Sequence, residues 1–157
     1  SKTFAMTGWR IGYIISTNLE AMQQVIKIQY YISACSNDAM QHAVLEAMEK
    51  AYDYPSKIAE QFKLRCDLIV ERLNAMPGVE CHKPKGAIYV FPRVTVEGMN
   101  SQEIAMELLK DGVLCSPGSA FGPSGEGHLR FAYTISLEYI SRGMDKVEQT
   151  LLRLQQP

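Results

Sequence analysis

Two basic residues near the start of the chain have the types and the spacing that cofactor chemistry needs. Lys2 is followed eight residues later by Arg10, which stands between Gly8 and Gly12. A lysine amine can form a Schiff base with an aldehyde, and an arginine can hold a phosphate with its forked N–H donors. Glycines let the backbone approach a ligand where a side chain would clash. On residue chemistry alone, a plain surface location remains the commoner explanation of a single lysine or arginine.

A third basic residue, Arg130, lies in the middle of a strand that we predict over residues 128–134. Strand alternation places Leu129, Phe131 and Tyr133 on one face and Arg130 on the other. The residue pattern allows two interpretations. Arg130 is either a solvent-facing arginine on a half-exposed sheet, or a bidentate clamp for a carboxylate, a geometry that arginine suits better than lysine.

Hydrophobic periodicity and end signals predict the elements that position these residues. Asn100 and Glu103 have the spacing of a capping box, and Gly112 follows as a helix stop. Apolar residues at steps of three and four predict helices over residues 19–31, 38–51, 55–75, 100–111 and 136–154. Apolar runs bounded by turn residues predict strands over residues 9–16, 79–81, 86–92, 113–115 and 128–134.

The order of these elements predicts an α/β chain. From residue 32 onward it suits an α+β small domain, a three-stranded sheet with helices packed on one face. Residues 1–31 differ, because they are predicted as one strand and one helix from another layer. We therefore expect two parts, residues 1–31 and residues 32–157.

Composition excludes several classes of function. The chain has 157 residues and a formal net charge of −1, which does not favour nucleic acid or an anionic membrane as a partner. No apolar run approaches the roughly 18 residues of a membrane span, and no signal peptide is apparent. Four scattered cysteines without a Cys-x-x-Cys pair indicate reduced thiols of a cytoplasmic protein and no metal site. The chain opens almost directly on Lys2 without an initiator Met, which we expect of a piece of a longer protein.

Four stretches, which form three blocks along the chain, resemble a known family. The run Ser-Lys-Thr-Phe-Ala-Met-Thr-Gly-Trp-Arg-Ile-Gly-Tyr of residues 1–13 is similar to the cofactor-lysine signature of the class I/II aminotransferases. These are the pyridoxal-phosphate enzymes of the aspartate aminotransferase superfamily, of fold type I. The Pro-Gly-x-x-Phe-Gly stretch of residues 117–122, the segment of residues 127–132 around Arg130, and the Gly-x-Tyr/Phe strand of residues 85–92 resemble its later motifs.

The resemblance implies a role for four residues. Lys2 would bind pyridoxal 5'-phosphate covalently and move the proton between the substrate Cα and the cofactor. Arg10 would hold the cofactor phosphate, and Arg130 the α-carboxylate of the amino acid. Tyr89 would face the active site, although a core tyrosine fits its pattern equally well.

The same resemblance implies a function for the parent protein. It would be an enzyme of amino-acid metabolism and biosynthetic processes, a cytoplasmic homodimer that transfers an amino group between an amino acid and a 2-oxo acid. Residues 1–31 would be the C-terminal end of its large pyridoxal-phosphate-binding domain, and residues 32–157 its small C-terminal domain. We expect the 157-residue fragment alone to be inactive. The alternatives are a catalytically silent folded fragment, or a superfamily relative that performs β-elimination or cyclopropane formation.

Overall fold

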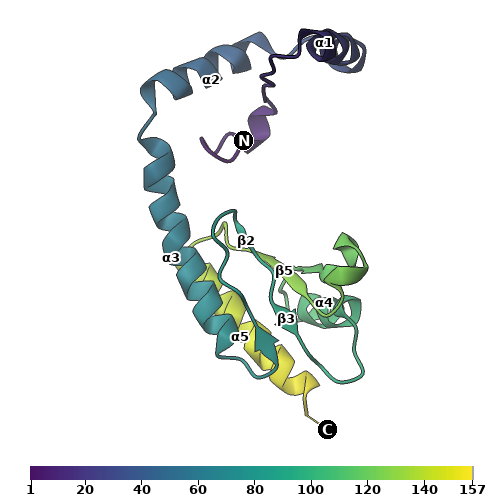
Figure 1. Cartoon of the computed structure of the whole chain (residues 1–157). Coiled ribbons are helices and arrows are strands. Elements are labelled where there is room, and N and C mark those ends of the chain that lie inside the picture. The colour runs from purple at the N-terminus through teal and green to yellow at the C-terminus, as the bar shows by residue number, and fades with distance from the viewer. Residues whose placement is uncertain (157) are drawn as a thin grey trace. The chain divides into compact units, whose positions relative to one another are not determined.

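A computed structural model describes residues 1–156 of the chain (Figure 1). The residues group into two units, Ser1–Ile58 and Ala59–Pro157. The division falls inside one long helix, α3 (Tyr54–Asn74). The domain boundary expected after residue 31 is not tested by this division and stays a prediction.

The first unit contains two helices that the sequence predicts. A short 3₁₀ turn, η1 (Thr7–Trp9), precedes α1 (Leu19–Ser33) and α2 (Asp38–Lys50). The Asn18 side chain caps α1 by accepting the backbone N–H of Ala21. Asn37 caps α2 in the same way, by accepting the backbone N–H of Met40.

The strand predicted over residues 9–16 does not form within the described residues. The chain leaves η1 through Arg10, whose φ is 51°, and residues 10–16 form no strand. A strand is stable only when its N–H and C=O groups pair with a neighbouring strand, and residues 1–58 contain no such neighbour. The prediction was wrong because the alternating pattern identifies a strand but does not supply its partner.

The helices of the first unit bury no residue completely. Residues 13–32 carry an exposed apolar set, nine large side chains that are each more than half exposed. Its members are Tyr13, Ile14, Ile15, Leu19, Ile26, Ile28, Tyr30, Tyr31 and Ile32. Exposure of this many large apolar side chains in one segment is typical of a surface that another part covers.

The second unit is built on two small antiparallel sheets. A three-stranded sheet has the order β2 (Tyr89–Val90), β5 (Leu129–Ala132) and β4 (Ser116–Pro117). A two-stranded sheet pairs β1 (Val79–Glu80) with β3 (Arg93–Val94). The expected three-stranded sheet is therefore confirmed.

Two of its strands are shorter or later than predicted. The strand expected over residues 86–92 reduces to β2, because Ala87 has a left-handed φ of 69° that interrupts extended backbone. In the region expected as a strand over residues 113–115, the N–H of Val113 bonds to the carbonyl of Leu108. The ladder with β5 begins only at Ser116.

Three helices share one hydrophobic core with this sheet. They are α3, α4 (Ser101–Lys110) and α5 (Leu137–Leu154), and their apolar stripes meet the buried face of β5 in one core. The most deeply buried members are Ile69, Leu73, Ile104, Leu108, Leu129, Val147 and Leu151. The predicted arrangement, with helices on one face, leaves the other face of the sheet free to carry a site.

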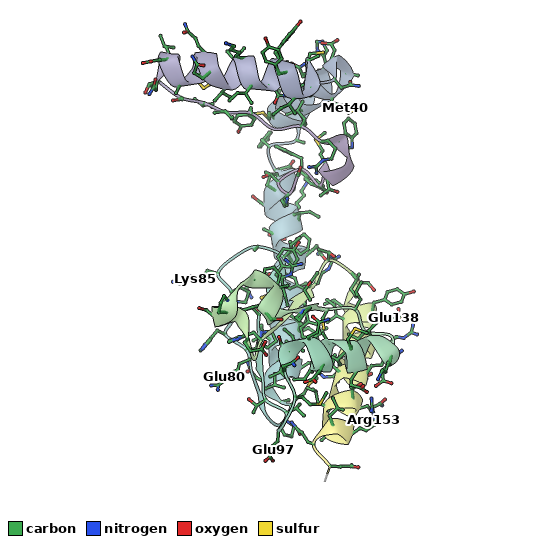
Figure 2. All side chains as sticks on the ribbon, turned by 90° about the vertical axis from the view of Figure 1, so that its right-hand side faces the viewer. Met40, Glu80, Lys85, Glu97, Glu138 and Arg153 are labelled. Carbon is green, nitrogen blue, oxygen red and sulfur yellow. The ribbon has the colours of Figure 1, made fainter. Side chains whose placement is uncertain are left out.

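Polar contacts join the helices at their edges. The Arg72 guanidinium on α3 binds the Asp145 carboxylate on α5 at 2.6 Å. Arg153 lies near the C-terminal end of α5 (Figure 2). Its guanidinium binds the carboxylates of Glu107 and Asp111 at 3.3 and 2.8 Å. The predicted capping box of Asn100 and Glu103 is present at the start of α4, so this end of the unit is fixed by local and long-range contacts.

Candidate active site

Strand register places Arg130 on the open face of the three-stranded sheet. Leu129 and Phe131, its neighbours in β5, are 0% and 3% exposed, whereas Arg130 is half-buried. Ser116 on β4 pairs with Arg130, and Tyr89 on β2 pairs with Ala132, two residues along β5. Side chains at these positions share a face and reach one another diagonally.

The guanidinium of Arg130 is held by three side chains. Its Nη2 donates to the Ser116 hydroxyl at 3.2 Å. Its Cζ lies over the rings of Tyr89 and Phe121, 4.5 and 4.6 Å from their centroids. Cation–π contacts at these distances are attractive, and most of the five N–H donors of the group remain available.

An aromatic group extends from Phe121 across the open face. The ring of Phe91 meets Phe121 edge to face, with centroids 5.9 Å apart. On its other side Phe91 stacks with the His128 imidazole, at 5.0 Å and an interplanar angle of 8°. Each ring therefore restricts the next one, and the series ends at Arg130.

Phe121 is presented by a tight turn that glycine makes possible. The turn consists of η2 (Gly118–Phe121) and η3 (Pro123–Gly125). The N–H of Gly118 bonds to the His128 carbonyl at 2.7 Å. A Cβ on Gly118 would stand 1.9 Å from the carbonyl oxygen of Gly125, so only glycine lets the two backbone segments come this close.

A polar contact ties the same turn to α4. The Glu126 carboxylate accepts the backbone N–H and the hydroxyl of Ser101 at 2.7 and 3.0 Å, and the N–H of Gly127 at 2.9 Å. These N–H donors, that of Ser101 first, lower the pKa of Glu126 below its ordinary value. Ser101 is itself buried and touches Ser119. The turn that carries Phe121 is thus held from both sides.

The loop before Tyr89 is also fixed. The Tyr133 hydroxyl donates to the Ala87 carbonyl at 2.9 Å, and Tyr133 packs on Phe62 of α3. Burial, with Cys66 nearby, raises the pKa of Tyr133 to about 12, so the hydroxyl remains protonated at neutral pH.

Lys2 and Arg10 lie in the first unit. Both side chains are exposed. Arg10 donates one N–H to the Thr7 carbonyl at 3.3 Å, and no carboxylate of the described residues pairs with the Lys2 amine. A Cβ added at Gly8 or Gly12 would meet nothing within 4 Å. The amine and the guanidinium are therefore open to a ligand.

The structure brings Tyr89 and Arg130 into contact in the second unit and places Lys2 and Arg10 in the first. The roles assigned to the four stay predictions. Sequence reasoning did not identify Phe121 and Ser116 as partners of Arg130. Phe121 lies in the quoted Pro-Gly-x-x-Phe-Gly stretch, which could have indicated it, whereas Ser116 carries no such signal.

Within residues 1–156, no three His, Cys, Asp or Glu side chains are grouped as metal ligands. None of the helices there combines the length and the apolar character that crossing a bilayer requires.

Comparisons with known proteins agree on one family. A family model described as "Aminotransferase class I and II" matches residues 1–147. An aspartate aminotransferase of Thermotoga maritima is 37% identical over 151 residues, which are 96% of this chain and 38% of that protein. An aromatic-amino-acid aminotransferase 2 of Thermococcus litoralis is 36% identical over 154 residues, 96% of this chain and 39% of that protein.

A solved structure gives the same result. An aromatic aminotransferase from Pyrococcus horikoshii superposes with a TM-score of 0.90 at 34% identity, covering 97% of this chain and 41% of that one. The chain thus spans about two fifths of the length of the proteins that it matches.

Proposed function

Because this chain belongs to the class I and II aminotransferases, we propose that it is the C-terminal part of a pyridoxal-phosphate-dependent aminotransferase. The reaction moves an amino group from an amino acid to a 2-oxo acid. The observation that carries the proposal is the Arg130 guanidinium, held on the open sheet face with donors to spare for a carboxylate. Amino acids and 2-oxo acids share that carboxylate.

The residues of the first unit fit the cofactor by their chemistry. Pyridoxal phosphate carries an aldehyde and a phosphate. The exposed primary amine of Lys2 can bond to the aldehyde carbon, and the guanidinium of Arg10 has N–H donors for the phosphate. When bound, the cofactor supplies a ring that stabilises negative charge at the substrate Cα.

The other steps fall to side chains of this chain. Arg130 binds the carboxylate with paired N–H donors and so fixes the orientation of the substrate. Once the amino group of the substrate has replaced it at the aldehyde carbon, the Lys2 amine would be free to remove the proton from the substrate Cα and later to return one. Arg10 holds the phosphate by charge and by hydrogen bonds. Tyr89 contributes one wall of the carboxylate site.

The remaining part of the parent protein is proposed to cover the exposed apolar set of residues 13–32. The relatives are more than twice as long as this chain, and nine exposed large apolar side chains favour a surface that another part covers. Residues 1–31 would then be the C-terminal end of the large domain, and residues 32–157 would form the small domain. We further propose that the whole protein is a cytoplasmic homodimer.

Amino transfer in the full-length protein tests the proposal. The protein is supplied with pyridoxal phosphate, pyruvate and, in turn, ¹⁵N-labelled aspartate, tyrosine or glutamate, and ¹⁵N-alanine is measured by mass spectrometry. We expect transfer from at least one donor. Arg130→Lys should lower kcat/KM by about 10- to 100-fold, because hydrogen bonds between charged groups are lost.

The matched control is Arg142→Lys, since Arg142 is an exposed arginine that also lies over a tyrosine ring. It should leave kcat/KM unchanged. Equal losses in both variants, or label that is released as ammonia and never reaches alanine, would contradict the proposal.

A further inference from the structure

We propose that Phe121 is a positioning residue for the carboxylate site, which together with Tyr89 holds the Arg130 guanidinium ready for an incoming carboxylate. The inference rests on the proposed function, because it concerns the same site. It gives Phe121, a member of the Pro-Gly-x-x-Phe-Gly stretch, a role toward Arg130 that the motif itself does not state.

The Tyr89 and Phe121 rings contact the Arg130 guanidinium without occupying the N–H donors that would bind a carboxylate. The N–H donors of a guanidinium point outward in its own plane. Phe121 and Tyr89 contact the group through their rings at Cζ, 4.6 and 4.5 Å from the ring centroids. A ring accepts no conventional hydrogen bond, so these contacts restrain Arg130 without using the donors that a carboxylate needs. Among the side chains of residues 1–156, only that of Ser116 takes one of them.

An Arg130 side chain that is already held in place should bind the substrate carboxylate more tightly. A free arginine side chain samples many rotamers and loses that freedom when it binds a carboxylate. A side chain already fixed by its surroundings loses less. The two rings and the Ser116 hydroxyl therefore lower the entropic cost of binding, and their effect should appear in substrate affinity.

Phe121 is the member of this group that can be tested cleanly. It is 52% exposed, so its ring is not part of the core. Its position depends on Phe91, which meets it edge to face, and on the glycine turn of residues 118–125. Replacing the ring should therefore change the contact with Arg130 while leaving the sheet intact.

The experiment compares two variants of Phe121 in the full-length protein, using the amino acid that the wild type transfers fastest as the probe. Phe121→Leu keeps an apolar side chain but removes the ring, and Phe121→Tyr keeps the ring. Phe121→Leu should raise KM about fivefold and change kcat less than about twofold, and Phe121→Tyr should restore the wild-type KM. In the Arg130→Lys background, Phe121→Leu should have little further effect, because it acts through Arg130.

Tyr139→Leu is the matched control. Tyr139 is similarly exposed and lies under a different arginine, Arg142, at 5.4 Å. It should leave both kinetic constants unchanged. A fall in kcat with an unchanged KM for Phe121→Leu, or the same effect with and without Arg130, would overturn the inference.

A second readout is independent of activity. The Nε–Hε NMR signal of Arg130, assigned by its loss in Arg130→Lys, should be shifted upfield by the ring currents of its two aromatic neighbours. Phe121→Leu should move it toward the position of exposed arginines, and Tyr139→Leu should not. If no amino transfer is found at all, the proposed function fails, and this signal alone decides whether Phe121 holds Arg130. An unchanged signal in Phe121→Leu would refute the inference, whatever the kinetics.

Discussion

Gly118→Ala should destabilise the second unit although it adds a single methyl group. The new Cβ would lie 1.9 Å from the Gly125 carbonyl oxygen and 2.6 Å from that of His128, both inside the roughly 3.0 Å that such atoms keep. Both neighbours are backbone, so the turn itself must move. The bond from the Gly118 N–H to the His128 carbonyl is then strained or lost.

The magnitude follows from two contributions. Overpacking of a tight contact costs about 1–3 kcal/mol, and one backbone hydrogen bond contributes about 1 kcal/mol. We expect the free energy of unfolding to fall by about 2–4 kcal/mol. For a unit of this size, each kcal/mol lowers the melting temperature by about 4–8 °C.

Gly143→Ala is the control, because it makes the same chemical change where the structure has room. Gly143 lies inside α5 and a Cβ there would meet nothing within 4 Å. Alanine is the better helix former by about 1 kcal/mol, so this variant should melt higher than the wild type. The assay is thermal unfolding followed by far-ultraviolet circular dichroism. Equal melting temperatures for the two variants would refute the geometry of the turn.

Three further predictions concern other contacts. The pKa of Glu126 is lowered by the N–H groups of Ser101 and Gly127. Its carboxylate therefore stabilises the fold above its ordinary pKa of 4.5, and this contribution disappears as the pH falls through the lowered value. In urea titrations, the difference in the free energy of unfolding between wild type and Glu126→Gln should shrink below pH 4.5. A difference that stays constant with pH would be inconsistent with this contribution. Burial raises the pKa of Cys81 and Cys115 to about 11, so iodoacetamide at pH 7.5 should label exposed Cys35 well before either of them, as peptide mass spectrometry would report. Asn100→Ala removes the capping box of α4 and should cost about 1 kcal/mol in urea denaturation, whereas Asn100→Asp should cost much less.

The sequence was most informative where structure depends on neighbours in the chain. The capping box of Asn100 and Glu103 follows from spacing alone and is present. The alternation of Leu129, Phe131 and Tyr133 also follows from local geometry, and all three are buried. Because this alternation fixes the face of Arg130, the sequence correctly predicted that its side chain points away from the core.

The sequence was least informative where structure depends on residues that are distant in the chain. Residues 9–16 alternate as a strand does, but residues 1–58, the unit that holds them, contain no strand to pair with them. The contact between Phe121 and Arg130 depends on a turn that folds back onto the sheet through Gly118 and Gly125. The spacing of residues along the sequence does not indicate that Phe121 contacts Arg130.

The attachment of pyridoxal phosphate to Lys2 tests the central claim most directly. The full-length protein is incubated with the cofactor, reduced with borohydride and digested, and the modified lysines are identified by mass spectrometry. The account predicts one modified site, at Lys2, that disappears in Lys2→Arg and persists in Lys27→Arg, a control at another exposed lysine. Modification scattered over other lysines and unaffected by Lys2→Arg would contradict it.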